Sequence, residues 1–280
     1  MKIVITGARG QLGQALQVTL ARHDIRAFDH AHLDITQLAA ARRAIENAKP
    51  ELIINAAAFN NVDGAENDPI AAYRGNALGP RNLAIVSAAH GIPLLHVSTD
   101  YVFDGTGIRP YHEFDRPNPQ SVYGASKLAG EDAVRGLNPR HYIVRTAWLY
   151  HTVGRNFAHT ICSLANQAEV RVVSDQYGSP TYAPHLALAI ARLVTSKDYG
   201  TYHFAGQGGA SWYEFAQALY QSLGMQTPIR PISTSEFPRP ARRPAYSVLT
   251  TMQDPAILLP SWREGVVAFA AARQKEPEQS

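Results

Sequence analysis

The segment "KIVITGARGQLGQAL" near the start of the chain constrains the fold more than any other. It is an apolar run followed by Gly7, Gly10 and Gly13, the last of which lies in a stretch of helical periodicity. Such glycines allow a tight turn and let the backbone approach a pyrophosphate at the positive end of a helix. A simple strand-to-helix connection would also tolerate them. The strand–loop–helix context nevertheless favours a dinucleotide-binding loop.

Apolar runs and helical stretches alternate through the first half of the chain. Further strands are predicted at 25–29, 51–57, 93–100 and 141–150, and helices at about 36–48, 68–90 and 123–135. The apolar runs lack regular alternation with polar residues, as expected for parallel strands covered on both faces. The sequence therefore predicts an α/β fold, a Rossmann-type doubly wound parallel sheet.

The pattern loosens after about residue 150 and predicts a smaller carboxyl-terminal α/β substrate lobe. We expect a dinucleotide-binding domain at 1–150 and a mainly substrate-binding lobe at 151–280, with the chain crossing between them. The proline-rich segment 228–244 is predicted to lack regular structure. A terminal helix should follow Pro260, and the tail from about 274 to 280 is expected to be disordered.

Charge and cysteine content exclude several classes of protein. The chain of 280 residues has 26 basic and 23 acidic side chains, and its arginines are scattered apart from "RPARRP" at 239–244. We therefore expect no nucleic-acid partner, whereas the cluster suits one phosphate-bearing ligand. The single cysteine, Cys162, excludes an internal disulfide and a cysteine-based metal site, and we expect it to be a buried, inert thiol. No long apolar stretch predicts a membrane span, and no room is left for a signal peptide, so we expect a cytoplasmic protein.

The end of the second predicted strand bears on the choice of cofactor. Asp29 could accept hydrogen bonds from an adenosine ribose, which favours NADH because a carboxylate repels the 2′-phosphate of NADPH. Arg9 in the glycine loop and the neighbouring His30 could each bind that phosphate. NADPH and NADH therefore both remain open. Asp34 could contact the adenine amino group or cap the following helix.

Tyr123 and Lys127 stand one turn apart on the same face of a predicted helix. Random placement of the tyrosines and lysines would give roughly 0.2 such pairs, so the spacing alone proves little. Thr99, however, ends the preceding predicted strand, at the sheet edge where open parallel sheets bind their ligands. A threonine hydroxyl, a tyrosine and a lysine at this edge together indicate proton-transfer chemistry.

These motifs resemble the extended short-chain dehydrogenase/reductases. The stretches "LDIT", "STDYVFDG", "VYGASKLAGE", "VVSDQYGSPTY" and "RPAYSVL" are similar to the dTDP-4-dehydrorhamnose reductase family, and the resemblance extends from residue 1 to about 270. It implies that NADPH or NADH reduces the C4 keto group of a dTDP-linked 4-keto-6-deoxy sugar, most simply dTDP-4-dehydrorhamnose to dTDP-rhamnose. Monomer and homodimer are both compatible with the sequence.

The resemblance also implies roles for the site residues. Tyr123 would give its proton to the C4 oxygen, and Thr99 would hydrogen-bond the same oxygen. Lys127, together with the nicotinamide charge, would lower the pKa of the Tyr123 phenol and hold the nicotinamide ribose. Asn76 would support a water near this lysine. Arg243, or Arg239 or Arg242 in its place, would bind the diphosphate with Asn156.

The resemblance assigns two sets of binding residues. The implied cofactor-binding residues are Gly7, Arg9, Gly10, Gln11, Leu12, Gly13, Asp29, Asp34, Ile35, Ala56, Ala57, Ala58, Asn76, Tyr123 and Lys127. The implied substrate-binding residues are Val62, Thr99, Asp100, Tyr101, Tyr123, Trp148, Asn156 and Arg243. Some relatives hold a metal at a dimer interface through acidic residues. Ala15 supplies no such carboxylate, so no metal is predicted.

Two departures from the family pattern and two alternative functions remain. Phe59 and Asn60 stand where relatives often have Tyr-Thr, and His151 stands where glycine is common.

One alternative function is that of a sugar-nucleotide epimerase or another ketoreductase of the superfamily. A dehydratase is disfavoured because Tyr101 replaces the second carboxylate that it needs. The other alternative is a non-catalytic NADP-binding regulatory subunit, which the retention of all three proton-transfer groups disfavours.

Overall fold

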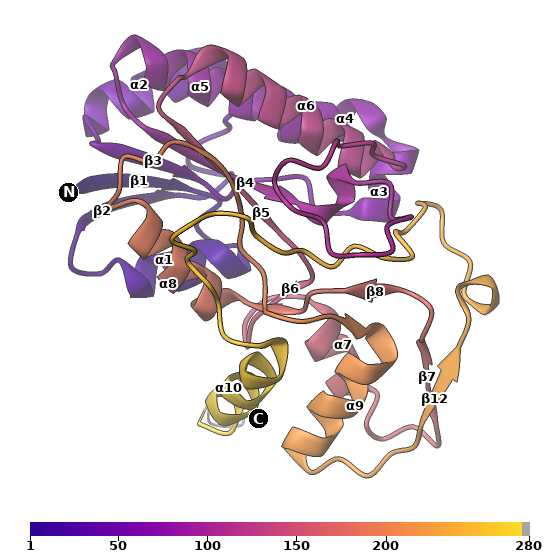
Figure 1. Cartoon of the computed structure of the whole chain (residues 1–280). Helices are drawn as coiled ribbons and strands as arrows, with labels where there is room; N and C mark the ends of the chain where they lie inside the picture. The colour runs from indigo at the N-terminus through magenta and orange to yellow at the C-terminus, as the bar shows by residue number, and fades with distance from the viewer. Residues whose placement is uncertain (276–280) are drawn as a thin grey trace.

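The computed structural model describes residues 1–275, and its centre is a six-stranded parallel sheet (Figure 1). In spatial order the strands are β10 (Gly200–His203), β5 (His141–Thr146), β4 (Leu94–Thr99), β3 (Leu52–Asn55), β1 (Lys2–Thr6) and β2 (Asp24–Phe28). Every neighbouring pair is parallel. The predicted α/β fold with a Rossmann-type sheet is confirmed.

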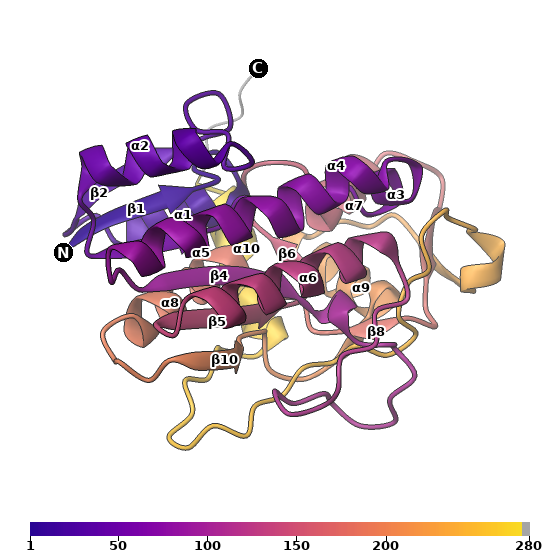
Figure 2. The same cartoon turned by 90° about the horizontal axis from the view of Figure 1, so that it is seen from above.

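Helices cover both faces of this sheet (Figures 1 and 2). One face carries α2 (Leu38–Ala48), α5 (Gly79–Ala89) and α6 (Val122–Leu137), and the other carries α1 (Gln11–Thr19) and α8 (Ala183–Leu193). Successive residues of a strand point to opposite faces of the sheet and pack in different cores. Ile3 and Ile5 pack in the core that contains Leu16 of α1, whereas Val4 packs in the core that contains Ile45 of α2. Burial on both faces explains why the strands read as continuous apolar runs.

The single helix predicted at 68–90 is divided in the structure. α4 (Pro69–Tyr73) and α5 are joined by a π-helical turn, Arg74–Leu78, and α3 (Val62–Asn67) precedes them. Pro80 has no N–H to donate to the carbonyl of Asn76, so regular helical bonding is interrupted at this point. The turn places Asn76, which is fully buried, against α6.

The carboxyl-terminal part forms a second core beneath the sheet. Its elements are β6 (Leu149–Tyr150), α7 (Phe157–Ser163), β7 (Val170–Val173), β8 (Tyr177–Gly178), β9 (Thr181–Tyr182), β11 (Ala210–Ser211), α9 (Trp212–Leu223), β12 (Ile229–Ile232) and α10 (Trp262–Arg273). Tyr150, Phe215 and Phe269 are central to its core, and Cys162 is buried beside them, as predicted. Because β10 pairs with β5 and α8 packs on α1, the chain returns to the large sheet after residue 180. The division into two domains at about residue 150 stays a prediction.

One prediction for this part is wrong. The proline-rich segment 228–244 contains β12, which pairs in parallel with β7, and a 3-10 turn at Thr234–Glu236. The backbone N–H groups of Val170 and Ser174 donate hydrogen bonds to the carbonyls of Pro228 and Ile232. Pro231 therefore lies between the residues that accept these hydrogen bonds. A proline is tolerated there because its nitrogen faces the open edge of the two-stranded sheet.

At the end of the chain the helix predicted after Pro260 is present, whereas residues 274 and 275, where the predicted disordered tail begins, are ordered. α10 begins after Ser261, whose side chain caps it, and Gln274 and Lys275 form a hydrogen-bonded turn behind it. The rest of the predicted tail, 276–280, lies outside the described residues. No helix in the described part of the chain is both long and apolar enough to cross a bilayer.

Candidate active site

The glycine loop packs so closely that a Cβ atom is excluded at Gly7 and Gly13. Gly7 has φ +78°, and a Cβ on it would collide with the backbone of Ala56 and Ala57 at the end of β3. A Cβ on Gly13 would collide with the backbone of Gly7. Gly10 caps α1 without a side-chain bond. The first N–H groups of α1 therefore remain available to an anionic ligand.

A cleft of about 740 Å³ opens at the carboxyl ends of β1, β2 and β3. Nine of the predicted cofactor residues line it, namely Gly7, Arg9, Gly10, Asp29, Asp34, Ile35, Ala56, Ala57 and Ala58. The predicted residues outside its lining are Gln11, Leu12, Gly13, Asn76, Tyr123 and Lys127. The sequence did not single out Leu33, Thr36 and Arg74, which also line it. Leu33 and Thr36 lie in the same loop as Asp34, and this closeness in the sequence could have identified them as cleft residues.

The alternative role of Asp34 as a helix cap is wrong. Its carboxylate accepts a hydrogen bond from the Thr36 backbone at 2.9 Å, whereas α2 begins at Leu38 with Gln37 in the capping position. Asp34 therefore stabilises the turn that forms one wall of the cleft.

The three proposed proton-transfer residues converge at the end of β4. Ser121 caps α6 by accepting a hydrogen bond from the Gly124 backbone, which places Tyr123 in the first turn of the helix. Lys127 lies one turn later and is almost fully buried, and its Nζ donates to the Val97 carbonyl of β4 at 2.6 Å. Thr99 ends the same strand two residues further on.

Burial controls the protonation of this group. It raises the pKa of Tyr123 to about 12, although the Thr99 hydroxyl acts in the opposite direction. It also lowers the pKa of Lys127 to about 8, against the charge of Glu131. In the protein alone the predicted lowering of the Tyr123 pKa therefore does not occur, because burial outweighs the Thr99 hydrogen bond. At neutral pH the phenol keeps its proton, which is the form that can donate.

Asn76 makes a clamp that the sequence did not predict. Its Oδ1 accepts from the Phe59 backbone at 2.8 Å, and its Nδ2 donates to the Phe59 carbonyl at 3.1 Å and to the Ser126 hydroxyl at 3.0 Å. The clamp holds the loop after β3 against α6, beside the residues that carry Tyr123 and Lys127.

Aromatic rings and a buried carboxylate surround Tyr123. The Tyr101 ring meets the Tyr123 ring edge-on, with centroids 5.4 Å apart. Asp100 is 2% exposed, and its two oxygens accept from the Thr99 hydroxyl at 3.0 Å and the Ser247 hydroxyl at 2.6 Å. Burial raises the pKa of Asp100 to about 6. Asp100 therefore accepts the single proton of the Thr99 hydroxyl and fixes the orientation of this group.

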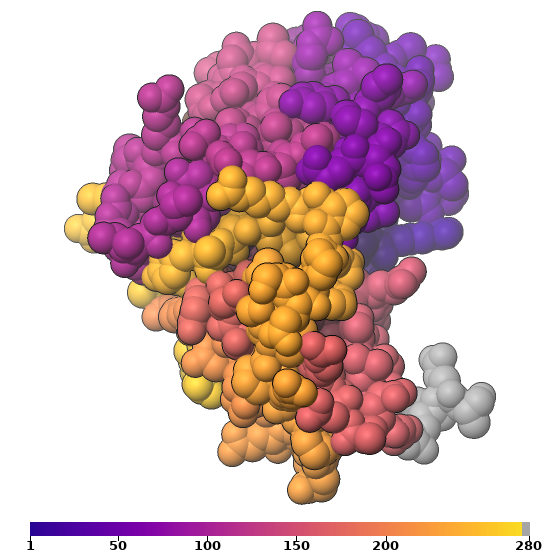
Figure 3. Space-filling view, turned by 90° about the vertical axis from the view of Figure 1, so that its right-hand side faces the viewer, coloured from indigo at the N-terminus to yellow at the C-terminus, as the bar shows by residue number. Residues whose placement is uncertain are grey.

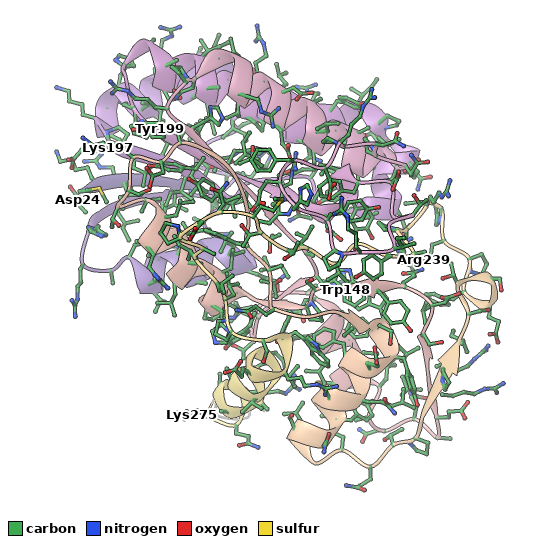
Figure 4. All side chains as sticks on the ribbon, in the orientation of Figure 1. Asp24, Trp148, Lys197, Tyr199, Arg239 and Lys275 are labelled. Carbon is green, nitrogen blue, oxygen red and sulfur yellow. The ribbon has the colours of Figure 1, made fainter. Side chains whose placement is uncertain are left out.

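Two predicted substrate residues hold the carboxyl-terminal lobe in place. Trp148 has φ +46° and stacks on Trp212 with ring centroids 3.3 Å apart, and Figure 4 shows it between the sheet and that lobe. Asn156 caps α7 and donates from Nδ2 to the His151 carbonyl at 2.8 Å and to Gln11 at 3.0 Å. Asn156 thus ties the glycine-loop helix to the lobe.

The arginine cluster meets a carboxylate that the sequence did not single out. Both terminal nitrogens of Arg243 donate hydrogen bonds to the Asp63 carboxylate, at 3.0 and 2.9 Å. A terminal nitrogen of Arg239 donates to the same carboxylate at 2.8 Å. The hydrogen bonds from Arg243 have the largest effect, and together with those from Arg239 they hold the pKa of the Asp63 carboxyl well below its usual range. Arg242 instead bonds Gln120 at 3.4 Å. Asp63 lies beside the predicted Val62 in the first turn of α3.

The segment that bears these arginines crosses between the two parts of the molecule. Figure 3 shows it in orange and yellow on the face between the sheet helices and the lobe, and Figure 4 labels Arg239 upon it. Within residues 1–275 no three His, Cys, Asp or Glu side chains are grouped to hold a metal ion.

Known proteins share this whole architecture. The family model described as the RmlD substrate binding domain matches residues 1–275. A dTDP-4-dehydrorhamnose reductase of Mycobacterium tuberculosis is 44% identical over 262 residues, covering 90% of this chain and 86% of the relative. The spore coat polysaccharide biosynthesis protein SpsK of Bacillus subtilis is 38% identical, covering 97% of this chain and 98% of that protein. The crystal structure of dTDP-4-dehydrorhamnose reductase from Bacillus anthracis in complex with NADP has a TM-score of 0.95 at 41% identity, covering 97% of this chain and 99% of that one.

Proposed function

Because this chain belongs to the dTDP-4-dehydrorhamnose reductase family, we propose that it reduces the C4 keto group of dTDP-4-dehydrorhamnose to give dTDP-rhamnose. It is an oxidoreductase that uses NADPH or NADH. The observation that carries the proposal is the convergence of Thr99, Tyr123 and Lys127 at the end of β4, close to a glycine-lined cleft. A cytoplasmic location is part of the proposal.

The chain's own residues fit a dinucleotide, since the glycine cradle has no room for Cβ atoms and leaves helix N–H groups available. The bound cofactor supplies the hydride. Tyr123 holds a proton at its phenol oxygen and delivers it to the C4 oxygen of the sugar. Thr99 hydrogen-bonds that oxygen once its single hydroxyl proton turns from Asp100 to the sugar. With the cofactor bound, the Lys127 ammonium and the positive charge of the oxidised nicotinamide together would stabilise the phenolate that remains after proton transfer.

The substrate's diphosphate would lie against the paired arginines. Arg243 and Arg239 together carry one more positive charge than Asp63 neutralises, and planar guanidinium groups suit phosphate oxygens. Arg243 and Tyr101 influence each other's pKa, which puts this charge near the ring that touches Tyr123. The hexose would then lie among Tyr101, Val62 and Trp148.

The charge of Lys127 predicts a pH dependence for turnover. Lys127 is protonated below its pKa of about 8 and neutral above it, while Tyr123 keeps its proton over this range. Turnover at saturating substrate should therefore be level from pH 6.5 to about 7.5 and decline as the pH rises through about 8. A rate that still increases at pH 9 would contradict this role of Lys127.

Replacing Asp63 should affect substrate binding more than chemistry. Asp63→Ala releases Arg239 and Arg243 from a fixed arrangement, so we expect KM for the nucleotide sugar to rise about tenfold and kcat to stay within about twofold. Asp132→Ala, which removes an exposed carboxylate paired with Arg135, is the matched control and should change neither. A lower KM in Asp63→Ala would instead mean that Asp63 competes with the diphosphate.

The direct test follows the absorbance of NADPH and of NADH during incubation with dTDP-4-dehydrorhamnose. Oxidation with formation of dTDP-rhamnose supports the proposal. Tight cofactor binding without oxidation would favour a regulatory subunit. Release of an isomer without net cofactor oxidation would favour an epimerase.

A further inference from the structure

The carboxylate at the end of β2 is engaged on both oxygens by basic residues. Asp29 Oδ2 lies 2.6 Å from Nε of Arg9, and Oδ1 lies 2.6 Å from Nδ1 of His32 and 3.1 Å from the His32 backbone nitrogen. The His32 hydrogen bond is the largest cause of a lowered pKa for Asp29, so this carboxyl is ionised. Asp29 is therefore an anion enclosed between two basic side chains.

Of the Arg9 and Asp29 side chains, that of Arg9 is far more accessible to a ligand in the cleft. The Asp29 side chain is 10% exposed, whereas that of Arg9 is 80% exposed, and both residues line the cleft. The ion pair uses Nε of Arg9, and the two terminal nitrogens have no hydrogen-bond partner within residues 1–275. A guanidinium presented in this way suits the oxygens of a phosphate group.

A free carboxylate in this position favours NADH, because it binds the ribose 2′-hydroxyl and repels a 2′-phosphate. Here Oδ1 already accepts both His32 contacts, so a ribose hydroxyl could reach the carboxylate only at Oδ2, beside Arg9. His32 approaches Asp29 from outside the cleft, since Asp29 and His30 line the cleft and His32 does not.

We propose that His32 is a specificity-determining residue of the cofactor site, which holds Asp29 against Arg9 so that Arg9 presents its guanidinium to the 2′-phosphate of NADPH. The inference rests on the proposed NAD(P)H-dependent function and deepens it. The chain accordingly prefers NADPH to NADH, although it carries an acidic residue at the end of β2.

The test is to measure the dissociation constants of NADPH and NADH with the intact protein by fluorescence titration, without the sugar. In His32→Ala, we expect the preference for NADPH over NADH to fall about tenfold, because Asp29 loses its imidazole partner and can turn towards the ribose, although Arg9 and the backbone N–H of residue 32 remain beside it. The His32 side chain is 69% exposed, so its removal should leave the fold intact. His90→Ala, at an exposed histidine that lies 3.7 Å from Glu46, is the matched control and should keep the wild-type ratio.

A second background separates the effect of His32 from a general loss of positive charge. In Asp29→Asn, the additional change His32→Ala should alter the ratio less than twofold, because no carboxylate remains to be held. An unchanged ratio in His32→Ala, with both cofactors still bound, would overturn this inference alone. A wild-type protein that binds neither cofactor would overturn the proposed function as well.

Discussion

Tyr123→Phe is expected to lower kcat by about 10²- to 10⁴-fold, because it removes the proton that the C4 oxygen must receive. The ring still packs edge-on against Tyr101, so the loss concerns the hydroxyl alone. Dissociation constants for NADPH and NADH should change less than about twofold, since Tyr123 does not line the cofactor cleft. Steady-state kinetics and cofactor titration measure the two quantities separately.

Tyr73→Phe is the matched control for this experiment. It removes the same hydroxyl from an exposed tyrosine on α4 and should retain wild-type turnover. If Tyr123→Phe kept more than about a tenth of the wild-type rate, another group would be the proton donor.

Arg145→Ala is expected to lower the free energy of unfolding by about 3–5 kcal/mol. Arg145 binds Glu131 with two nitrogens, at 2.9 and 2.7 Å, and the two side chains are 2% and 0% exposed. Burial opposes the ionisation of Glu131, but the hydrogen bonds and charge of Arg145 outweigh it and lower the Glu131 pKa. Without Arg145, a buried carboxylate one turn from Lys127 would lose its main partner. Urea unfolding followed by circular dichroism measures the loss.

The same carboxylate provides the control. Arg135 also contacts Glu131, but it is 41% exposed and lies 3.4 Å away. Arg135→Ala should therefore cost less than about 1 kcal/mol. An equal decrease in the free energy of unfolding in the two variants would mean that the buried ion pair contributes no more to stability than the exposed one.

The sheet and the glycine loop could be predicted because local sequence determines them. Strands buried on both faces read as continuous apolar runs, and the close approach of Gly7 to β3 excludes every larger residue. The position of Tyr123 and Lys127 on one helix face followed in the same way from their spacing.

The parts that could not be predicted depend on partners that are distant in sequence. Asp63 and Arg243 are 180 residues apart, and β12 is a strand only because β7 lies beside it. Local patterns carry no information about such pairs. The raised pKa of Tyr123 was missed for a related reason, because it results from burial, which depends on how distant segments pack around the ring.

The most direct test of the central claim uses NADPH in which both hydrogens at C4 of the nicotinamide ring are replaced by deuterium. The protein is incubated with this cofactor and dTDP-4-dehydrorhamnose, and the product is analysed by mass spectrometry and NMR. Hydride transfer to the keto carbon predicts dTDP-rhamnose with one deuterium at C4 of the sugar. A product without deuterium, or with deuterium at another carbon, would contradict the proposed reaction.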